Sequence, residues 1–295
     1  MAPKLLYAPP NCSLNLTTLS LRIKCKQQNP WHFPLLYRPD PSLPETATAT
    51  AVRYNSTVLL LALDTCDARG SVAILRDSAL LGVVAHETSQ DYSSWLLPAV
   101  SGVLRSAGLN VANLDAFAVA SGPGSFTGLR VGLTSVKAWS EVYAKPIAAV
   151  SRLEALAVQA QGNEPYVAAF VDAHRSQVFG ALYRRVGQDF ERIGEDTVLA
   201  PDAFLERVAG LAQGQRVAWI SMDPERLTSQ ARWPEREKSG ERVQMSSTVL
   251  APLIGQLGYR RVLDGKVTDA LGLEADYVRR SDAEVFWKAG AGHAR

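Results

Sequence analysis

Apolar runs that alternate with polar breaks predict an ordered body of mixed strands and helices. The run at 57–65 is apolar in its centre and ends in an acidic residue and a hydroxyl, as expected of a buried strand that points a carboxylate into a site. The runs at 71–75 and 79–86 flank a short Arg-Asp-Ser turn and predict a hairpin. Apolar residues at helical spacing over 93–107, followed by a glycine, predict a helix.

The pattern of the first half begins again in the second half of the chain. A predicted strand at 166–171 is followed by an aspartate, a turn and another strand at 178–183. The periodicity then weakens, and the polar stretch 223–241 is predicted to be a long loop. The other expected elements are strands at 116–120, 147–150 and 216–221 and helices at 126–144, 151–161, 201–212 and 247–263.

A glycine-rich decapeptide, Ser-Gly-Pro-Gly-Ser-Phe-Thr-Gly-Leu-Arg at 121–130, joins a predicted strand to a predicted helix. Ser125 or Thr127 is the expected N-cap. Such a loop directs backbone N–H groups and the positive end of the helix dipole at one spot, where an anion could bind. A purely structural turn is the alternative, because the run lacks the Lys-Ser/Thr ending of a P-loop. The candidate anion or nucleotide loop comprises Asp64, Thr65, Gly122, Gly124, Ser125 and Thr127.

Two further glycines give the helix at 126–144 a smooth face. Gly128 and Gly132 lie one turn apart, so the first two turns present little side-chain bulk there. Another helix could approach this face closely, and the face suits either core packing or contact with a partner. If a partner binds there, Gly132→Arg is expected to block the contact.

Composition and charge narrow the class of protein. The 295 residues are 47% hydrophobic and 20% charged with a formal net charge of +2, so a large core is expected and nucleic-acid binding is not indicated by charge. The three cysteines lack metal-ligand spacing, as in proteins of reducing compartments, and the histidines include no helical metal pair. No apolar run is long enough to span a bilayer. We therefore expect a cytoplasmic protein without a resident metal or membrane contact.

The two ends of the chain are expected to lie outside the fold. Residues 1–56 are rich in proline and hydroxyl side chains, and Asp40 and Glu45 are their only acidic residues. This composition predicts a disordered N-terminal extension or an upstream start codon chosen in error, with a transit peptide as the alternative. The last residues, 289–295, are predicted to form a flexible tail.

Five segments, in order along the chain, resemble the bacterial TsaB (YeaZ) family. They are LALDTCDARGSVAIL, SGPGSFTGLRVGL, IAAVSRLEALA, VDAHRSQVFGALY and YVRR, and the resemblance spans 58–288. The GPGSFTGLR motif is specific to this family and to the sister TsaD/Kae1 proteins. The resemblance implies the two-lobed α/β fold of actin, Hsp70 and sugar kinases (the ASKHA fold), with a first lobe at 57–150 and an abbreviated second lobe at 151–288.

The same resemblance implies a role in tRNA modification. TsaB proteins belong to the complex that installs threonylcarbamoyl on the adenosine beside the anticodon, forming t6A. In that complex a TsaD-like subunit catalyses the transfer, a TsaE-like ATPase resets the assembly, and the TsaB subunit is a non-catalytic scaffold. The resemblance therefore implies these two partners, a homodimer when the catalytic partner is absent, contact with tRNA through the complex, and no required cofactor. Weak nucleotide binding stays open.

The absence of a histidine pair agrees with a non-catalytic role. The sister TsaD/Kae1 proteins hold a metal with two histidines four residues apart on a helix, whereas the stretch 88–95 contains no histidine. Two departures from the family pattern are Tyr92, where many members have histidine, and the charged insertion at 223–241.

The resemblance places the partner contact on the helices at 93–107 and 126–144. Tryptophan and arginine are residue types that anchor interfaces. The alternative for Leu96 and Val100 is that they face the core. The expected contact residues are Trp95, Leu96, Val100, Gly128, Arg130, Val131, Gly132 and Val136.

Two enzyme classes are the alternatives. An ATP-dependent phosphotransferase of the ASKHA type would use Asp64 to hold magnesium and would draw on Asp172, which precedes His174 and Arg175. Aspartates at strand ends also commonly cap turns. A peptidase has the least support, because the spacing identifies no Ser/His/Asp set and no metal pair.

Overall fold

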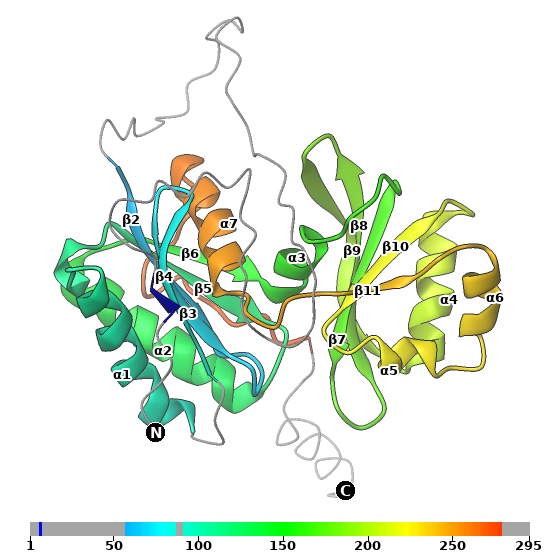
Figure 1. Cartoon of the computed structure of the whole chain (residues 1–295), viewed down its shortest axis with the longest axis horizontal. Helices are drawn as coiled ribbons and strands as arrows, with labels where there is room; N and C mark the ends of the chain where they lie inside the picture. Colours follow the sequence, from blue (N-terminus) through cyan, green and yellow to red (C-terminus); the bar gives the residue numbers. More distant parts are fainter. Residues whose placement is uncertain (1–5, 8–56, 87–90, 279–295) are drawn as a thin grey trace, which may run out of the picture.

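Two β-sheets form the centres of two lobes that lie side by side (Figure 1). The computed structural model describes residues 6–7, 57–86 and 91–278. The predicted tail at 289–295 lies outside these ranges, as does the predicted extension at 1–56 apart from the strand Leu6–Tyr7.

The first sheet is built from the apolar strands of the first half of the chain. Its order is β1-β4-β3-β2-β5-β6. The hairpin strands β3 and β4 continue antiparallel from β2, whereas β5 and β6 run parallel to it. The strands are β1 (Leu6–Tyr7), β2 (Leu59–Asp64), β3 (Ser71–Arg76), β4 (Ala79–Ala85), β5 (Ala116–Gly122) and β6 (Ile147–Ser151).

Helices cover both faces of this sheet. α1 (Tyr92–Ser106) and α2 (Phe126–Tyr143) lie on one face, and α7 (Ala251–Leu263) lies on the other (Figure 1). A short 3-10 turn, η2 (Val111–Asn113), leads into β5. Because both faces are covered, the central strands are buried almost throughout and need the continuous apolar runs seen in the sequence.

α7 corrects the predicted division of the chain. The range 151–288 is expected to form the second lobe, but α7 packs against β2, β3, β5 and β6 of the first sheet. Gly255 and Gly258 allow this close approach, because a side chain at either position would collide with residues of the sheet. Beyond the helix the chain bridges to β6. The C-terminal part of the described chain therefore belongs to the first lobe.

The second sheet repeats the order and the strand directions of the first, apart from β1, which has no counterpart. β7 is central, β8 and β9 continue antiparallel on one side, and β10 and β11 run parallel on the other. This duplication confirms the predicted two-lobed α/β fold of the ASKHA type. The strands are β7 (Tyr166–Asp172), β8 (Val178–Val186), β9 (Asp189–Leu199), β10 (Val217–Ser221) and β11 (Val243–Met245).

The helices of the second lobe are shorter than those of the first. α4 (Pro201–Ala212) covers the outer face of the sheet. α3 (Arg152–Ala157) begins at the predicted cap, Ser151, and lies between the lobes, in contact with β5, β6 and β7.

The stretch 223–241 is not the long loop that its charge predicts. It contains α5 (Glu225–Thr228) and α6 (Trp233–Lys238), which bury Leu227 and Trp233 against the second core. Trp219 of that core donates its indole N–H to Glu241 over 2.7 Å. The segment is therefore an integral cover of the lobe.

Candidate functional site

An arginine is completely buried where the two lobes meet. Arg152 is the first residue of α3, and its side chain is 2% exposed. Its Nε lies 3.4 Å from Oδ2 of Asp64, and its Nη2 lies 3.1 Å from Oδ2 of Asp67. A buried guanidinium requires such partners because desolvation of an unpaired charge is very costly.

A second arginine extends this ion-pair arrangement across the two lobes. Arg69, in the loop after β2, donates two hydrogen bonds of 3.0 Å to the two carboxylate oxygens of Asp223 and lies 2.9 Å from Asp67. Asp223 follows β10 of the second lobe. Bidentate Arg–carboxylate pairs have fixed geometry, so this contact sets how the lobes meet. The inter-lobe charge network comprises Asp64, Asp67, Arg69, Arg152 and Asp223.

The network determines the ionisation of its central carboxylate. Burial raises the pKa of Asp67, but the guanidinium groups of Arg152 and Arg69 outweigh burial and bring the pKa down to about 2. For Arg152, burial lowers the pKa, and the facing Asp64 and Asp67 raise it above its usual value overall. Asp67, Arg69 and Arg152 are therefore charged at neutral pH.

We predict that Asp67→Asn removes an acid-sensitive part of the stability. A carboxylate whose pKa is lowered on folding stabilises the fold above its unfolded pKa, and this contribution disappears as the pH falls from about 4 to about 2. The variant should lose about 2 kcal/mol of unfolding free energy at pH 7 and much less near pH 2. Urea unfolding across this pH range measures the difference. A difference that does not change with pH would contradict the prediction.

The strand-end aspartates occupy equivalent positions in the two lobes. Asp64 ends β2 and accepts a hydrogen bond of 2.9 Å from the N–H of Cys66; Asp172 ends β7 and accepts one of 2.9 Å from the N–H of His174. Each also pairs with an arginine, Asp172 with Arg226 at 2.8 Å. His174 itself is 85% exposed. Its Nδ1 lies 3.5 Å from Oδ2 of Asp172. Both aspartates therefore cap the turns that follow their strands.

The glycine loop packs against the turn that follows β2. The backbone N–H of Ser125 donates to the carbonyl of Cys66 over 2.6 Å, and the Thr65 hydroxyl donates to the carbonyl of Gly128 over 2.7 Å. Side chains at Gly124 or Gly128 would collide with backbone atoms of this turn. The structure thus packs Thr65 and Cys66 against the glycine loop. The glycines serve this close packing, and nucleotide binding stays a prediction.

The loop also positions the helix that follows it. Ser125 caps α2, its hydroxyl accepting from the N–H of Gly128 at 3.4 Å. Ser125 and Thr127 are exposed, whereas Gly122 is buried and has a φ of 123°, which favours glycine.

The predicted contact surface needs a correction, because most of its residues are buried. Val131 is half-buried, and Arg130 is exposed. The apolar positions of α1 and α2 face the sheet, and Gly132 faces the Thr65 side chain. The buried residues are Trp95, Leu96, Val100, Gly128, Gly132 and Val136. These residues belong to the core. For Leu96 and Val100 this is the alternative given in the sequence analysis.

The surface of α2 instead carries an exposed group of aromatic and arginine side chains. The Arg130 guanidinium lies 3.8 Å from the ring centroid of Phe126, and the Phe126 and Tyr277 rings lie 5.2 Å apart. Arg130 also donates to the Tyr277 hydroxyl over 3.4 Å. Phe126 and Tyr277 are 39% and 45% exposed. We call these three residues the surface cluster; it joins the GSFTGLR and YVRR motifs, which are distant in the sequence.

Tyr92, the departure from the family pattern, has a structural role here. Its hydroxyl donates to the carbonyl of Asp67, and its ring lies 4.6 Å from that of His86. These contacts join the start of α1 to the loop that carries the inter-lobe charge network.

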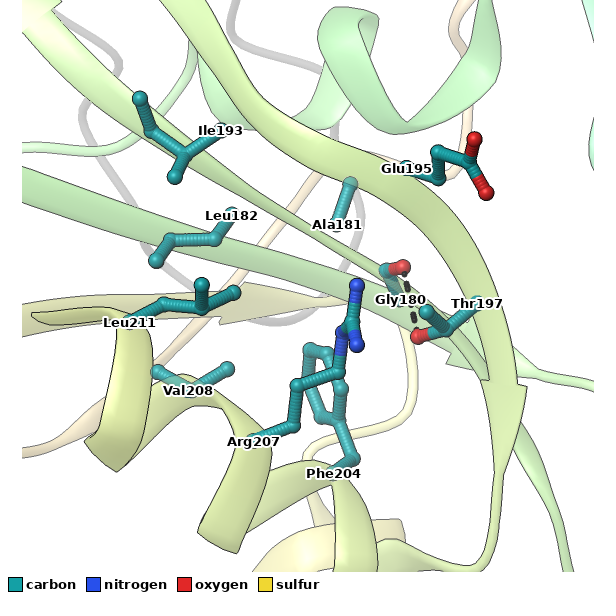
Figure 2. A pocket seen from close by; sticks show the side chains of 10 residues that line it. All are labelled: Gly180, Ala181, Leu182, Ile193, Glu195, Thr197, Phe204, Arg207, Val208 and Leu211. Atoms are coloured by element: carbon teal, nitrogen blue, oxygen red, sulfur yellow. Dashed lines mark hydrogen bonds between the residues drawn. The ribbon is translucent and has the colours of Figure 1, made fainter.

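A shallow groove on the outer face of the second lobe has no room for a ligand. Gly180 lacks a side chain where the Phe204 ring packs, and Thr197 donates to its carbonyl over 3.2 Å (Figure 2). Arg207 and Glu195 lie at the rim. The groove encloses no space large enough for a water molecule.

The described part of the chain contains neither a candidate metal cluster nor a helix that could span a membrane. Within 57–86 and 91–278, no group of three or more histidine, cysteine or acidic residues is arranged to hold a metal. In the same part of the chain, no helix combines the length and apolarity that crossing a membrane requires.

Known proteins share both the sequence pattern and the fold. Residues 73–230 match the family model for TsaD, tRNA N6-adenosine threonylcarbamoyltransferase. The tRNA threonylcarbamoyladenosine biosynthesis protein TsaB of Bacillus subtilis is 27% identical over 77% of this chain and 97% of its own length. The protein of the same name from Escherichia coli is 29% identical over 78% of this chain and 96% of its own.

Two solved structures of Pseudomonas aeruginosa proteins resemble this protein. One is an uncharacterized protein with similarity to the peptidase YeaZ; it has a TM-score of 0.60 and 27% identity over 75% of this chain and 100% of its own. The other, YeaZ, has a TM-score of 0.57 and 25% identity over 75% of this chain and 99% of its own.

Proposed function

Because the chain belongs to the family that the TsaD model describes, and within it to the TsaB (YeaZ) proteins, we propose that it is a non-catalytic scaffold in tRNA t6A biosynthesis. Participation in t6A biosynthesis follows from the named relatives. In the proposed role the chain binds a TsaD-like catalytic subunit and activates it for threonylcarbamoyl transfer. A TsaE-like ATPase and tRNA join through the complex.

The proposed non-catalytic role is supported by the ion pair between Asp64 and Arg152. An ASKHA phosphotransferase would need this strand-end carboxylate for magnesium, whereas here one of its oxygens faces Arg152 and the other caps the following turn. The carboxylate is 0% exposed. A guanidinium thus supplies, from within the chain, the positive charge that a cation would otherwise bring.

The surface cluster supports the partner contact. Arginine and aromatic side chains are the types enriched at binding hot spots, and here they are exposed at the start of α2. Leu97 of the neighbouring α1 is 57% exposed. We propose that this surface, in place of the buried residues predicted earlier, binds the TsaD-like subunit, and that it forms a homodimer when that subunit is absent.

Charge reversal in the surface cluster should weaken this binding. Arg130→Glu, combined with Phe126→Ala, is expected to raise the Kd for the TsaD-like subunit of the same organism by at least about 30-fold, the effect of losing one hot spot. Co-purification of the full chain and calorimetric titration measure it. Arg184→Glu is the matched control, since Arg184 is an exposed, ion-paired arginine on β8 of the other lobe.

Two results would contradict the proposal in different ways. If the double variant binds like the wild type, the contact surface is wrong. If the wild type binds no TsaD-like subunit, the scaffold role fails, and nucleotide hydrolysis by the isolated chain then tests the phosphotransferase alternative.

A further inference from the structure

A buried carboxylate of the second lobe has one oxygen without a hydrogen-bond donor. Asp196 lies on β9, and its side chain is 4% exposed. Its Oδ1 accepts from Nη1 of Arg192 over 3.3 Å. Its Oδ2 is buried and has no hydrogen-bond partner. A buried acceptor without a hydrogen bond costs free energy, so we expect a donor close to this oxygen.

The group that faces Asp196 is another carboxylate. The side chain of Asp276 lies within hydrogen-bonding reach of it. Asp276 belongs to the segment 273–278, which we call the C-terminal strap, and its backbone N–H donates to the carbonyl of Ser121 at the end of β5 over 2.7 Å. The strap is therefore attached to the first lobe while its carboxylate meets the second. Two ionised carboxylates have no proton to donate, and only a shared proton makes this contact a hydrogen bond.

The surroundings supply little compensating charge. Arg192, on the same strand, is 48% exposed. Tyr183 of β8 has a buried hydroxyl without a partner, and Glu154 of α3 is already paired with Arg261 of α7. On the strap itself, Glu274 is exposed. Burial raises the pKa of Asp196. Arg192 opposes this rise and Asp276 adds to it, and the pKa of Asp196 is about 6 as a result.

We propose that a proton shared by Asp196 and Asp276 fastens the C-terminal strap to the second lobe and thereby sets the position of Tyr277 in the surface cluster. Tyr277 directly follows Asp276 and contacts Phe126 and Arg130. Below about pH 6 Asp196 carries the proton and the strap is seated. Above this pH Asp196 loses the proton, the hydrogen bond to Asp276 is lost and the strap loosens. The consequence for partner binding rests on the proposed function, whereas the protonation itself does not.

Hydrogen exchange of the full chain tests the proposal without any partner. The reporter is the Asp276 amide, whose N–H donates to Ser121. After correction for the intrinsic exchange rate, its protection in the wild type should fall about tenfold between pH 5.5 and pH 7.5. In Asp196→Asn the amide can donate to Asp276 at every pH, so protection should stay high and independent of pH.

A control variant and a comparison with magnesium or EDTA make the test specific. Asp202→Asn is the control, because Asp202 in the first turn of α4 also has a buried oxygen without a partner; this variant should keep the wild-type pH profile. Protection that is independent of pH in the wild type would overturn the proposal. A wild-type profile that shifts with magnesium or EDTA would overturn it too, since a cation would then hold the pair.

The outcome for the proposed function is measured separately. Titration of the TsaD-like subunit at pH 5.5 and 7.5 should show tighter binding at the lower pH, and Asp196→Asn should abolish the difference. If no binding occurs at either pH while the exchange profile appears as expected, the scaffold role fails and the proton-linked strap stands. Equal binding at both pH values would remove the link between the strap and the surface cluster.

Discussion

Arg152→Met should lower the free energy of unfolding by about 3–5 kcal/mol, the range found when one partner of a buried ion pair is removed. Methionine fills much of the space but leaves Asp64, which is 0% exposed, without its cationic partner. Asp67 keeps Arg69 and is less affected. Urea unfolding at pH 7 measures the loss.

Two further variants separate charge from packing. Arg184→Met removes an exposed ion pair with Glu191 and should leave stability unchanged. Adding Asp64→Asn to Arg152→Met should recover part of the loss, because the orphaned buried charge is then gone. If Arg152→Met were as stable as Arg184→Met, the inter-lobe charge network would not hold the lobes as we describe.

Gly128→Val should destabilise the protein by about 3 kcal/mol, at the upper end of overpacking effects. Its Cβ would collide with the carbonyl oxygen of Thr65, a backbone atom that cannot move aside. Thermal unfolding measures the effect. Gly210→Ala is the control: Gly210 is also helical, but its Cβ position is open, so this change should stabilise the protein by up to ~1 kcal/mol.

The same reasoning changes how Gly132→Arg is interpreted. Gly132 faces the Thr65 side chain, so the arginine would disturb the fold before it met any partner. A loss of partner binding in that variant therefore says little about the contact surface. Retained stability in Gly128→Val would show instead that the glycine face is free, as the sequence-based interface hypothesis supposes.

Most elements were predictable because their signals are local. The hairpin, α1 and α2 lie within a residue or two of their predicted bounds, and Ser125 and Ser151 cap the helices that they precede. β9 escaped prediction because polar residues occupy both of its faces. α5 and α6 span 4 and 6 residues, too short for helical periodicity to be seen.

The candidate site was predictable only in part. Thr65 and the glycine loop could be identified because a strand end and a glycine turn are visible in the sequence, and in the structure they are in contact. Arg152 could not be identified, because nothing near it indicates that its partner is a carboxylate 88 residues earlier. Of the surface cluster, the sequence identified Arg130 but not Phe126 or Tyr277, since periodicity finds an apolar face but not the residues around its edge.

The sequence by itself determined most of the strands, the helix caps and the family, because each depends on residues that are close together in the chain. The tertiary structure decided what those residues do. It closed the glycine loop onto Thr65, 63 residues before Gly128, paired Asp64 with Arg152, and brought Tyr277 to Phe126 and Arg130. Burial and charge pairing depend on contacts between distant segments, and only the folded chain brings those segments together.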